Sequence, residues 1–234
     1  MPLRGILNTA RTLSFYTKLQ ELTANNLANS DTDGFKADYM SAMLPSSDAF
    51  PVPVQKVDLN QGSLNATGRE LDVALEGPGF MVLQTPAGER LSRGGSLMLD
   101  GANQLSDRHG NLVLGNKGPI AIPIQHGKIE IQADGGVVVD GTQVGQLRME
   151  TVADQNTLLK EGAGRFITST PTIPVTTATT TLHQGQVEQS NQDSLKGMVD
   201  LVTIQRAYAA NVDALKAMDS VLGNVVNEVG KSDA

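Results

Sequence analysis

The 234-residue sequence contains no cysteine and no tryptophan, and aromatic residues make up only 3% of it. The lack of cysteine excludes disulfide bonds, thiolate metal sites and cysteine nucleophiles. No stretch approaches the roughly 18 consecutive apolar residues of a membrane-spanning helix. The N-terminus also lacks the unbroken apolar run and the small-residue cleavage site of a secretory signal peptide. We therefore expect a protein that does not span a membrane and carries no cleaved signal.

Positive charge is scarce as well. Lys and Arg together number 18, against 25 Asp and Glu, which gives a formal net charge of −7. No window concentrates basic residues strongly enough to follow a phosphate backbone. Nucleic acid is therefore not an expected partner.

The N-terminal segment has the periodicity of an amphipathic helix from Leu3 to about Leu27. Its apolar residues recur at spacings of three and four, which places them on one helical face. That face holds Leu3, Ile6, Ala10 and Leu13, and a shifted stripe continues with Leu19 and Leu22. Such a helix needs a partner for its apolar side.

A second, longer helix is predicted from about Ser194 to Val229. Its stripe positions alternate by threes and fours, as the seam of a coiled coil does. A first stripe holds Leu195, Met198, Val202, Gln205, Ala209 and Val212. The phase then slips by one residue, and a second stripe holds Leu215, Met218, Leu222, Val225 and Val229. The slip marks either a bend or a change of partner.

The middle of the chain, from about Leu64 to Phe166, has a different character. Short apolar runs alternate with Gly-rich and Asp-Gly turns, which are hairpin signals. In "KIEIQ", Ile129 and Ile131 share one face and Glu130 takes the other, the period-two pattern of a half-buried strand. The spacing predicts an all-β sandwich or irregular barrel. The Thr-rich run "TSTPTIPVTTATTTL" that follows favours extended backbone, and we interpret it as a return connection.

The order helix, β domain, helix defines an α+β fold, in which a discontinuous coiled-coil domain of terminal helices accompanies a central all-β domain. We assign residues 1–40 to the N-terminal helix and turn, 41–63 to a linker, 64–167 to the β domain, 168–190 to the return segment and 191–234 to the C-terminal helix. The two helices either pack on each other as an intramolecular hairpin or pack on copies from neighbouring chains. Periodicity favours neither arrangement.

The segment "NSDTDGF" resembles a calcium loop in its oxygen-rich composition. Asn29, Asp31, Asp33 and Gly34 match loop positions 1, 3, 5 and 6, but position 12 is Met40 where a bidentate Glu is required. We therefore predict that this segment ends the helix with Asx turns and binds no metal.

No other motif predicts catalysis or cofactor binding. The run "GGSLM" lacks the second glycine of a nucleophile elbow, and we interpret it as a hairpin turn. His109, His126 and His183 stand in separate turn or loop contexts without paired spacing. The glycines of "EGPGF" are expected to turn one strand into the next, since no Lys or helix follows them to hold phosphate.

Four blocks, taken together and in order, resemble the axial proteins of the bacterial flagellum, the family of rod, hook and hook-associated proteins. The blocks are "ANNLANSDTDGFKADY", "GRELDVALEGPGFMVLQ", "LSRGGSLMLDGANQLSDRHGNLVLG" and "GQVEQSNQDSLKGMVDLVTIQRAY". They cover more than a third of the chain. Within this family the match is closest to the rod proteins of the basal body.

This resemblance implies a structural role and no enzyme activity. The terminal helices would form an inner coiled-coil domain lining a hollow tube, with the β domain outside. Other copies of the chain and the adjoining rod proteins would be its partners. The flagellar type III export apparatus would deliver the chain unfolded, without signal cleavage, to a periplasmic rod.

On this basis we predict which residues pack between subunits. The asparagine amides among them can satisfy backbone groups between packed helices. The set comprises Leu3, Ile6, Ala10, Leu13, Asn25, Asn26, Leu27, Asn29, Leu195, Val202, Ala209, Val212, Leu215 and Leu222. A long helix with so narrow a seam buries little area, so we expect the terminal helices to fray until they assemble.

Overall fold

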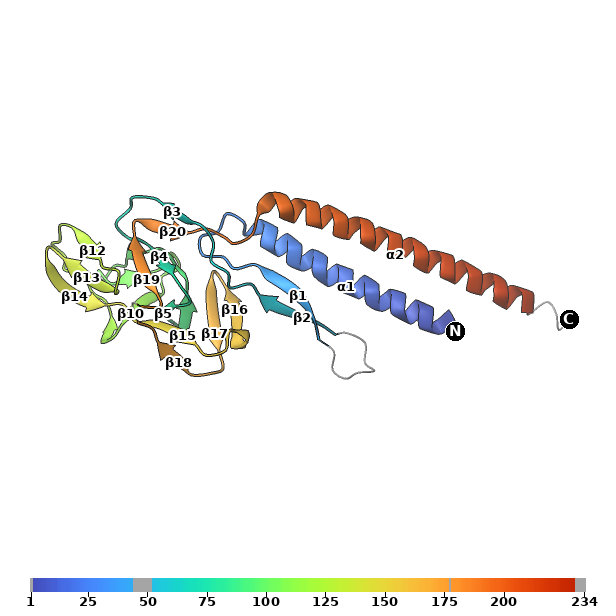
Figure 1. Cartoon of the computed structure of the whole chain (residues 1–234), viewed down its shortest axis with the longest axis horizontal. Helices are drawn as coiled ribbons and strands as arrows, with labels where there is room; N and C mark the ends of the chain where they lie inside the picture. Colours follow the sequence, from blue (N-terminus) through green and yellow to red (C-terminus); the bar gives the residue numbers. More distant parts are fainter. Residues whose placement is uncertain (1, 44–51, 177, 230–234) are drawn as a thin grey trace. The chain divides into compact units, whose positions relative to one another are not determined.

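The computed structural model describes residues 2–43, 52–176 and 178–229; the side chains of residues 2–4, 42–43, 52 and 225–229 are not part of that description. The chain divides into two units (Figure 1). The helical unit comprises Met1–Ala28, Asp38–Gln55 and Asp193–Ala234. The β unit comprises Asn29–Ala37 and Lys56–Gln192. The α+β class predicted from the sequence is confirmed.

Two long helices dominate the helical unit: α1 (Pro2–Ala28) and α2 (Ser194–Val229). They run side by side in opposite directions (Figure 1). Proline suits the first turn of α1 because its missing N–H would have no intrahelical partner there. Asp193 caps α2, since its carboxylate accepts a hydrogen bond from the backbone N of Lys196 at 2.9 Å. Neither helix, over its described residues, is long and apolar enough to cross a membrane.

A two-stranded sheet of β1 (Asp38–Met43) and β2 (Val52–Val57) follows α1 in the chain. Strand β1 contacts α1 within the helical unit. Residues 41–63 were predicted to be a linker, so this strand pair was not expected from the sequence.

The β unit is built from antiparallel pairs. Its largest sheet has the strand order β16-β17-β6-β5-β10-β9-β8, with β11 also paired to β10, β15 to β5, and β18 to β15. These strands are β5 (Phe80–Thr85), β6 (Gly88–Ser92), β8 (Met98–Leu99), β9 (Leu105–Ser106), β10 (Leu112–Gly115), β11 (Gly118–Pro119), β15 (Met149–Val152), β16 (Leu158–Gly162), β17 (Arg165–Thr168) and β18 (Thr172–Pro174).

Three smaller sheets complete the described part of the β unit. One has the order β12-β13-β14, one β19-β4-β7, and one pairs β20 with β3. Their strands are β3 (Leu64–Ala66), β4 (Asp72–Glu76), β7 (Gly94–Ser96), β12 (Ile129–Ile131), β13 (Gly136–Val139), β14 (Thr142–Gln146), β19 (Thr181–Gln184) and β20 (Gln186–Glu188). A short 3-10 helix, η1 (Gln155–Thr157), precedes β16.

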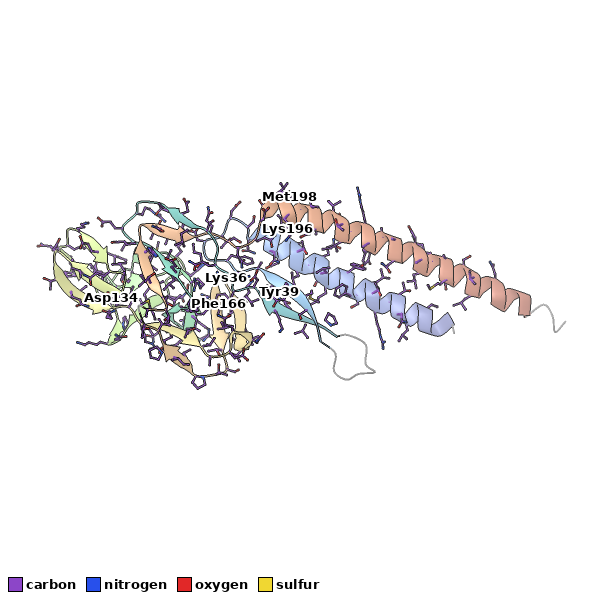
Figure 2. The ribbon with its side chains drawn as sticks, viewed as in Figure 1. Lys36, Tyr39, Asp134, Phe166, Lys196 and Met198 are labelled. Atoms are coloured by element: carbon purple, nitrogen blue, oxygen red, sulfur yellow. The ribbon has the colours of Figure 1, made fainter. Side chains whose placement is uncertain are left out.

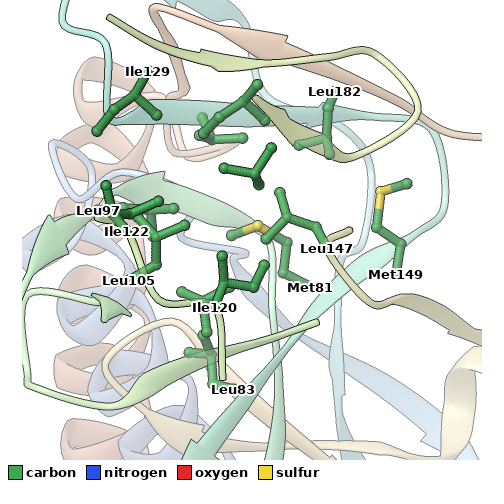
Figure 3. Packing of buried hydrophobic residues seen from close by; sticks show 14 of the residues in the cluster. Met81, Leu83, Leu97, Leu105, Ile120, Ile122, Ile129, Leu147, Met149 and Leu182 are labelled. Atoms are coloured by element: carbon green, nitrogen blue, oxygen red, sulfur yellow. The ribbon is translucent and has the colours of Figure 1, made fainter. Parts of the chain in front are cut away.

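Strand β5 separates two hydrophobic clusters. Met81 and Leu83 point into the main cluster, together with Ile129 and Ile131 of β12 (Figure 3). Phe80 and Val82 alternate with them and enter a second cluster. This explains why "FMVLQ" reads as a continuous apolar run, since a strand buried on both faces needs no polar side. The half-buried pattern predicted for "KIEIQ" is also confirmed, because Glu130 is exposed.

The prediction of a hairpin turn at "GGSLM" is wrong. Gly94 to Ser96 form strand β7, which pairs with β4. Gly94 has φ +96°, and a Cβ there would lie 2.5 Å from the carbonyl oxygen of Val73. Gly94 therefore lets this strand approach β4 closely, a use of glycine that composition alone does not separate from a turn.

The second cluster generates a stability prediction. Phe166 is almost fully buried and packs edge-on against Phe80, with ring centroids 5.6 Å apart. We expect Phe166→Ala to lower the free energy of unfolding by about 3–5 kcal/mol, because it leaves a large cavity. Leu159→Ala is the matched control on the neighbouring strand, where the side chain is 60% exposed, and should change stability by less than about 0.5 kcal/mol. Urea unfolding followed by circular dichroism measures both; equal losses would contradict the cluster.

Candidate functional site

Helix α2 has an inner face that packs toward α1. Its least exposed positions recur by alternating fours and threes over the whole described helix. They are Gly197, Leu201, Ile204, Tyr208, Asn211, Leu215 and Leu222. Met218 belongs to the same series, and its sulfur lies 3.8 Å from the hydroxyl of Thr9 on α1. This face is one uninterrupted seam.

The face of α1 toward this seam is rich in threonine. Thr9 and Thr23 are buried, and Thr12 is partly buried. Their hydroxyls donate to carbonyl oxygens four residues earlier, at 3.0 Å from Thr9 to Gly5 and 2.8 Å from Thr23 to Leu19. Each hydroxyl is thereby satisfied within its own helix, and the methyl group remains for packing.

Helix α2 also has an outer apolar stripe near its N-terminus, which we define as Leu195, Met198, Val199 and Val202. These side chains are 72%, 54%, 59% and 48% exposed. Figure 2 shows Met198 on the side of α2 away from α1. Four large apolar side chains on neighbouring turns form a contiguous exposed patch, which is typical of an interaction surface.

The two stripes predicted for α2 therefore lie on different faces of one continuous helix. The first stripe is mostly on the outer face, and Leu215 and Leu222 of the second stripe belong to the inner seam. The phase slip near Val212 is a change of face and not an interruption of the helix.

The predicted packing residues divide accordingly. Those that are buried or half-buried within the chain are Ile6, Leu13, Asn26, Leu27, Asn29, Val212, Leu215 and Leu222. Those that are exposed are Ala10, Asn25, Leu195, Val202 and Ala209. The side chain of Leu3 lies outside the described residues. The exposed group is the part of the set that is open to a neighbouring molecule.

Asn26 has a definite partner inside the helical unit. Its side-chain amide donates to the carbonyl oxygen of Asp38 at 2.7 Å and accepts from the backbone N of Asp38 at 2.9 Å. The Asn26 side chain is buried. It thus replaces a missing strand partner at the start of β1 and attaches β1 to α1.

We expect Asn26→Ala to destabilise the helical unit by about 1–3 kcal/mol, because it leaves two buried backbone groups of Asp38 without partners. Hydrogen exchange at the Asp38 amide should become faster in this variant. Asn8→Ala, at an exposed position of the same helix, is the control and should leave that amide unchanged. Equal exchange in the two variants would refute the attachment.

The β unit contains a buried cluster of three charged side chains, Lys36, Arg93 and Glu188, which we call the junction cluster. The Nζ of Lys36 lies 2.5 Å from Oε1 of Glu188, and a guanidinium nitrogen of Arg93 lies 3.0 Å from Oε2. Lys36 is drawn among the strands in Figure 2. All three side chains are at most 4% exposed. Buried charges of this kind are tolerable only when each is paired and hydrogen-bonded.

Backbone carbonyl oxygens accept further hydrogen bonds from the two cations of the junction cluster. Arg93 donates to the carbonyl oxygens of Leu75, Gly77 and Gly79, at 3.0, 2.6 and 2.5 Å. Lys36 donates to the carbonyl oxygen of Asn60 at 2.7 Å. The cluster therefore ties together segments that are distant in the sequence.

The side chain of Asn191 makes a second set of hydrogen bonds to backbone groups beside the junction cluster. Its side chain accepts from the backbone N of Ala37 at 2.7 Å and donates to the carbonyl oxygens of Asp58 and Asn60 at 2.8 and 3.1 Å. The backbone N of Gly34 also donates to the carbonyl oxygen of Glu188 at 2.6 Å. The first and last segments of the β unit are thus held side by side.

Burial lowers the pKa of Lys36 from its ordinary value of 10.5, and the hydrogen bond and charge of Glu188 oppose that shift only in part. The unfolded chain consequently binds more protons than the folded chain in the pH range below 10.5, so stability rises with pH there.

As the pH rises toward 10.5, we expect the free energy of unfolding of the β unit to increase by more in the wild-type chain than in Lys36→Met, which has no proton to lose at this site. Denaturant unfolding at a series of pH values measures both slopes. Parallel pH dependences would contradict the lowered pKa.

Sequence reasoning missed the junction cluster. Its members lie in three of the blocks that carry the family resemblance, in "DGFKADY", "LSRGG" and "GQVEQ". Nothing in the sequence pairs the three, because their separations are 57 or more residues.

The oxygen-rich turn after α1 has no ion-site geometry. Asp33 pairs with Arg108 at 3.2 Å, and the side-chain oxygen of Asn29 accepts from the Thr32 hydroxyl at 3.3 Å. Over the residues that the structure describes, no three His, Cys, Asp or Glu side chains gather into a metal site.

Three segments of this chain match described protein families. Residues 8–36 match the family described as "Flagella basal body rod protein", residues 74–139 match "Flagellar hook protein FlgE/F/G D1 domain", and residues 183–228 match "Flagellar basal body rod FlgEFG protein C-terminal". Each of the three matches contains one member of the junction cluster: Lys36 lies in the first, Arg93 in the second and Glu188 in the third.

Several relatives match over nearly the whole chain. The flagellar basal-body rod protein FlgF of Caulobacter vibrioides is 29% identical, with 90% of this chain and 91% of the relative covered. FlgF of Escherichia coli is 30% identical, with 87% and 89% covered. FlgG of Buchnera aphidicola is 31% identical, with 85% and 89% covered.

The chain belongs to the family of flagellar basal-body rod proteins. It is accordingly a structural subunit of the rod, which is part of the basal body of the flagellum. The resemblance predicted from the four sequence blocks is confirmed.

Proposed function

We propose that this chain is a FlgF-type subunit of the proximal rod and that it polymerises through its terminal helices into part of the hollow drive shaft. The observation that carries this proposal is the outer apolar stripe of α2, which the described chain leaves uncovered. Burying such a stripe against neighbouring helices stabilises an assembly by about 25 cal/mol for each Å2 of apolar surface. FlgF-named relatives from two organisms support the particular type.

The proposed partners follow from this role. They are other copies of the chain, the adjoining rod proteins FlgB, FlgC and FlgG, and the flagellar type III export apparatus. The proposed location is the periplasmic rod, reached without a cleaved signal peptide. We assign no catalytic or cofactor-binding residue to the chain.

The distal-rod protein FlgG of the same family is the second candidate. FlgG-named relatives match with identities similar to those of the FlgF relatives. The sequence "QRAY" of α2 also favours this alternative. Expression in strains that lack either FlgF or FlgG distinguishes the two, since motility should return only where the missing subunit is replaced.

The assembly surface is tested by Val202→Asp. A charge within the outer stripe should abolish swimming and incorporation into basal bodies, because an unpaired carboxylate cannot be buried against a neighbouring helix. The purified variant should retain the wild-type circular dichroism and thermal unfolding, since Val202 is exposed and is not a member of the inner seam. Motility in soft agar and immunoblots of isolated basal bodies measure the effect.

Ala214→Asp serves as the control on the same helix, because Ala214 is exposed but lies outside the stripe. It should reduce swimming much less than Val202→Asp does. Normal basal bodies containing Val202→Asp would remove the outer stripe from the assembly surface.

A further inference from the structure

The last segment of the β unit, residues 179–191, completes sheets that begin more than a hundred residues earlier. Within this closing segment, β19 pairs with β4 and β20 pairs with β3. Leu182 enters the main hydrophobic cluster (Figure 3). The backbone N of Gln189 donates to the carbonyl oxygen of Ser63 at 2.8 Å. The β20–β3 pair and the β19 edge of the β19-β4-β7 sheet therefore cannot form until this segment is present.

Three glycines from the early part of the β unit make room for the closing segment. A Cβ at Gly62 would lie 2.0 Å from the carbonyl oxygen of Gln189, and one at Gly77 would lie 2.2 Å from that of Thr179. A Cβ at Gly79 would lie 2.7 Å from the side chain of Thr180. Backbone approach this close requires glycine, so the closing segment packs directly against the earlier strands at these three positions.

The closing segment also supplies the buried negative charge that pairs with two cations of the earlier part of the β unit. Lys36 and Arg93 are both cations, and each lies in the part of the chain made before the closing segment. Their buried acidic partner is Glu188, which bonds both. Asp58 is the other acidic group that acts on Lys36, and it is only partly buried. Without Glu188, closure of the β unit would bury two like charges with backbone carbonyls as their main partners, which is strongly unfavourable.

We propose that the β unit closes only when the carboxylate of Glu188 is in contact with Lys36 and Arg93. Without that carboxylate, repulsion between the two cations keeps the unit open. The junction cluster then makes closure of the β unit depend on the last segment of that unit. This property is independent of the position of the subunit in the rod.

The test compares refolding of the full-length wild-type chain with Glu188→Gln, which keeps the shape of the side chain and removes its charge. The three tyrosines, Tyr16, Tyr39 and Tyr208, all lie in the helical unit, so tyrosine fluorescence does not report on the β unit. Pulsed hydrogen exchange of the amides that pair β19 with β4 and β20 with β3 does, because these pairs need the closing segment. Glu161→Gln is the matched control, because that carboxylate pairs with Arg90 at a partly exposed position.

We expect protection of the β19–β4 and β20–β3 pairs to appear at least about tenfold more slowly in Glu188→Gln, since the contacts of Glu188 are required in the transition state for closure. Glu161→Gln should fold at the wild-type rate. The double variant Lys36→Met, Glu188→Gln should recover most of the lost rate, because only Arg93 then remains charged and it retains its three carbonyl acceptors.

A Glu188→Gln chain that refolds at the wild-type rate and merely unfolds faster would overturn the proposal, because Glu188 would then be a late stabilising contact. If Glu188→Gln acquires no protection at all, the double variant decides. Protection regained in the double variant supports the proposal. A double variant as slow or as unprotected as the single one overturns it.

Discussion

The pairing of Glu188 with Lys36 and Arg93 is the constraint on which the architecture of the β unit depends. One carboxylate bonds two buried cations, and removing it leaves two like charges without an acidic partner in the interior. The same place joins residue 34 to residue 188 and residue 37 to residue 191 through hydrogen bonds. The chain therefore enters and leaves the β unit at adjacent points, which is the condition for two terminal helices to meet at all.

Helix α2 serves two purposes because its sequence carries two stripes. The inner seam is continuous and packs on α1, whose threonines satisfy their own hydroxyls. The outer stripe is confined to the N-terminal turns of α2 and is uncovered in the described chain. One face thus builds the subunit, and the second face is the assembly surface that we propose.

Sequence periodicity predicted the elements with long, regular patterns. The bounds of α2, the alternation at Ile129 and Ile131, and the all-β middle follow from spacing alone. Which stripe of α2 faces α1 did not follow, because both stripes have the same heptad spacing. The junction cluster and the strand at Gly94 were also beyond prediction, since they depend on tertiary approach between segments that share no local signal.

The division of the chain into two units has a mechanical consequence. The backbone passes between the helical unit and the β unit four times, after residues 28, 37, 55 and 192. A load transferred from one unit to the other is therefore shared by four covalent segments, and a single proteolytic cut in any one of them leaves three connections intact. A shaft built from such subunits would not rely on noncovalent adhesion alone to hold its inner and outer parts together under rotation.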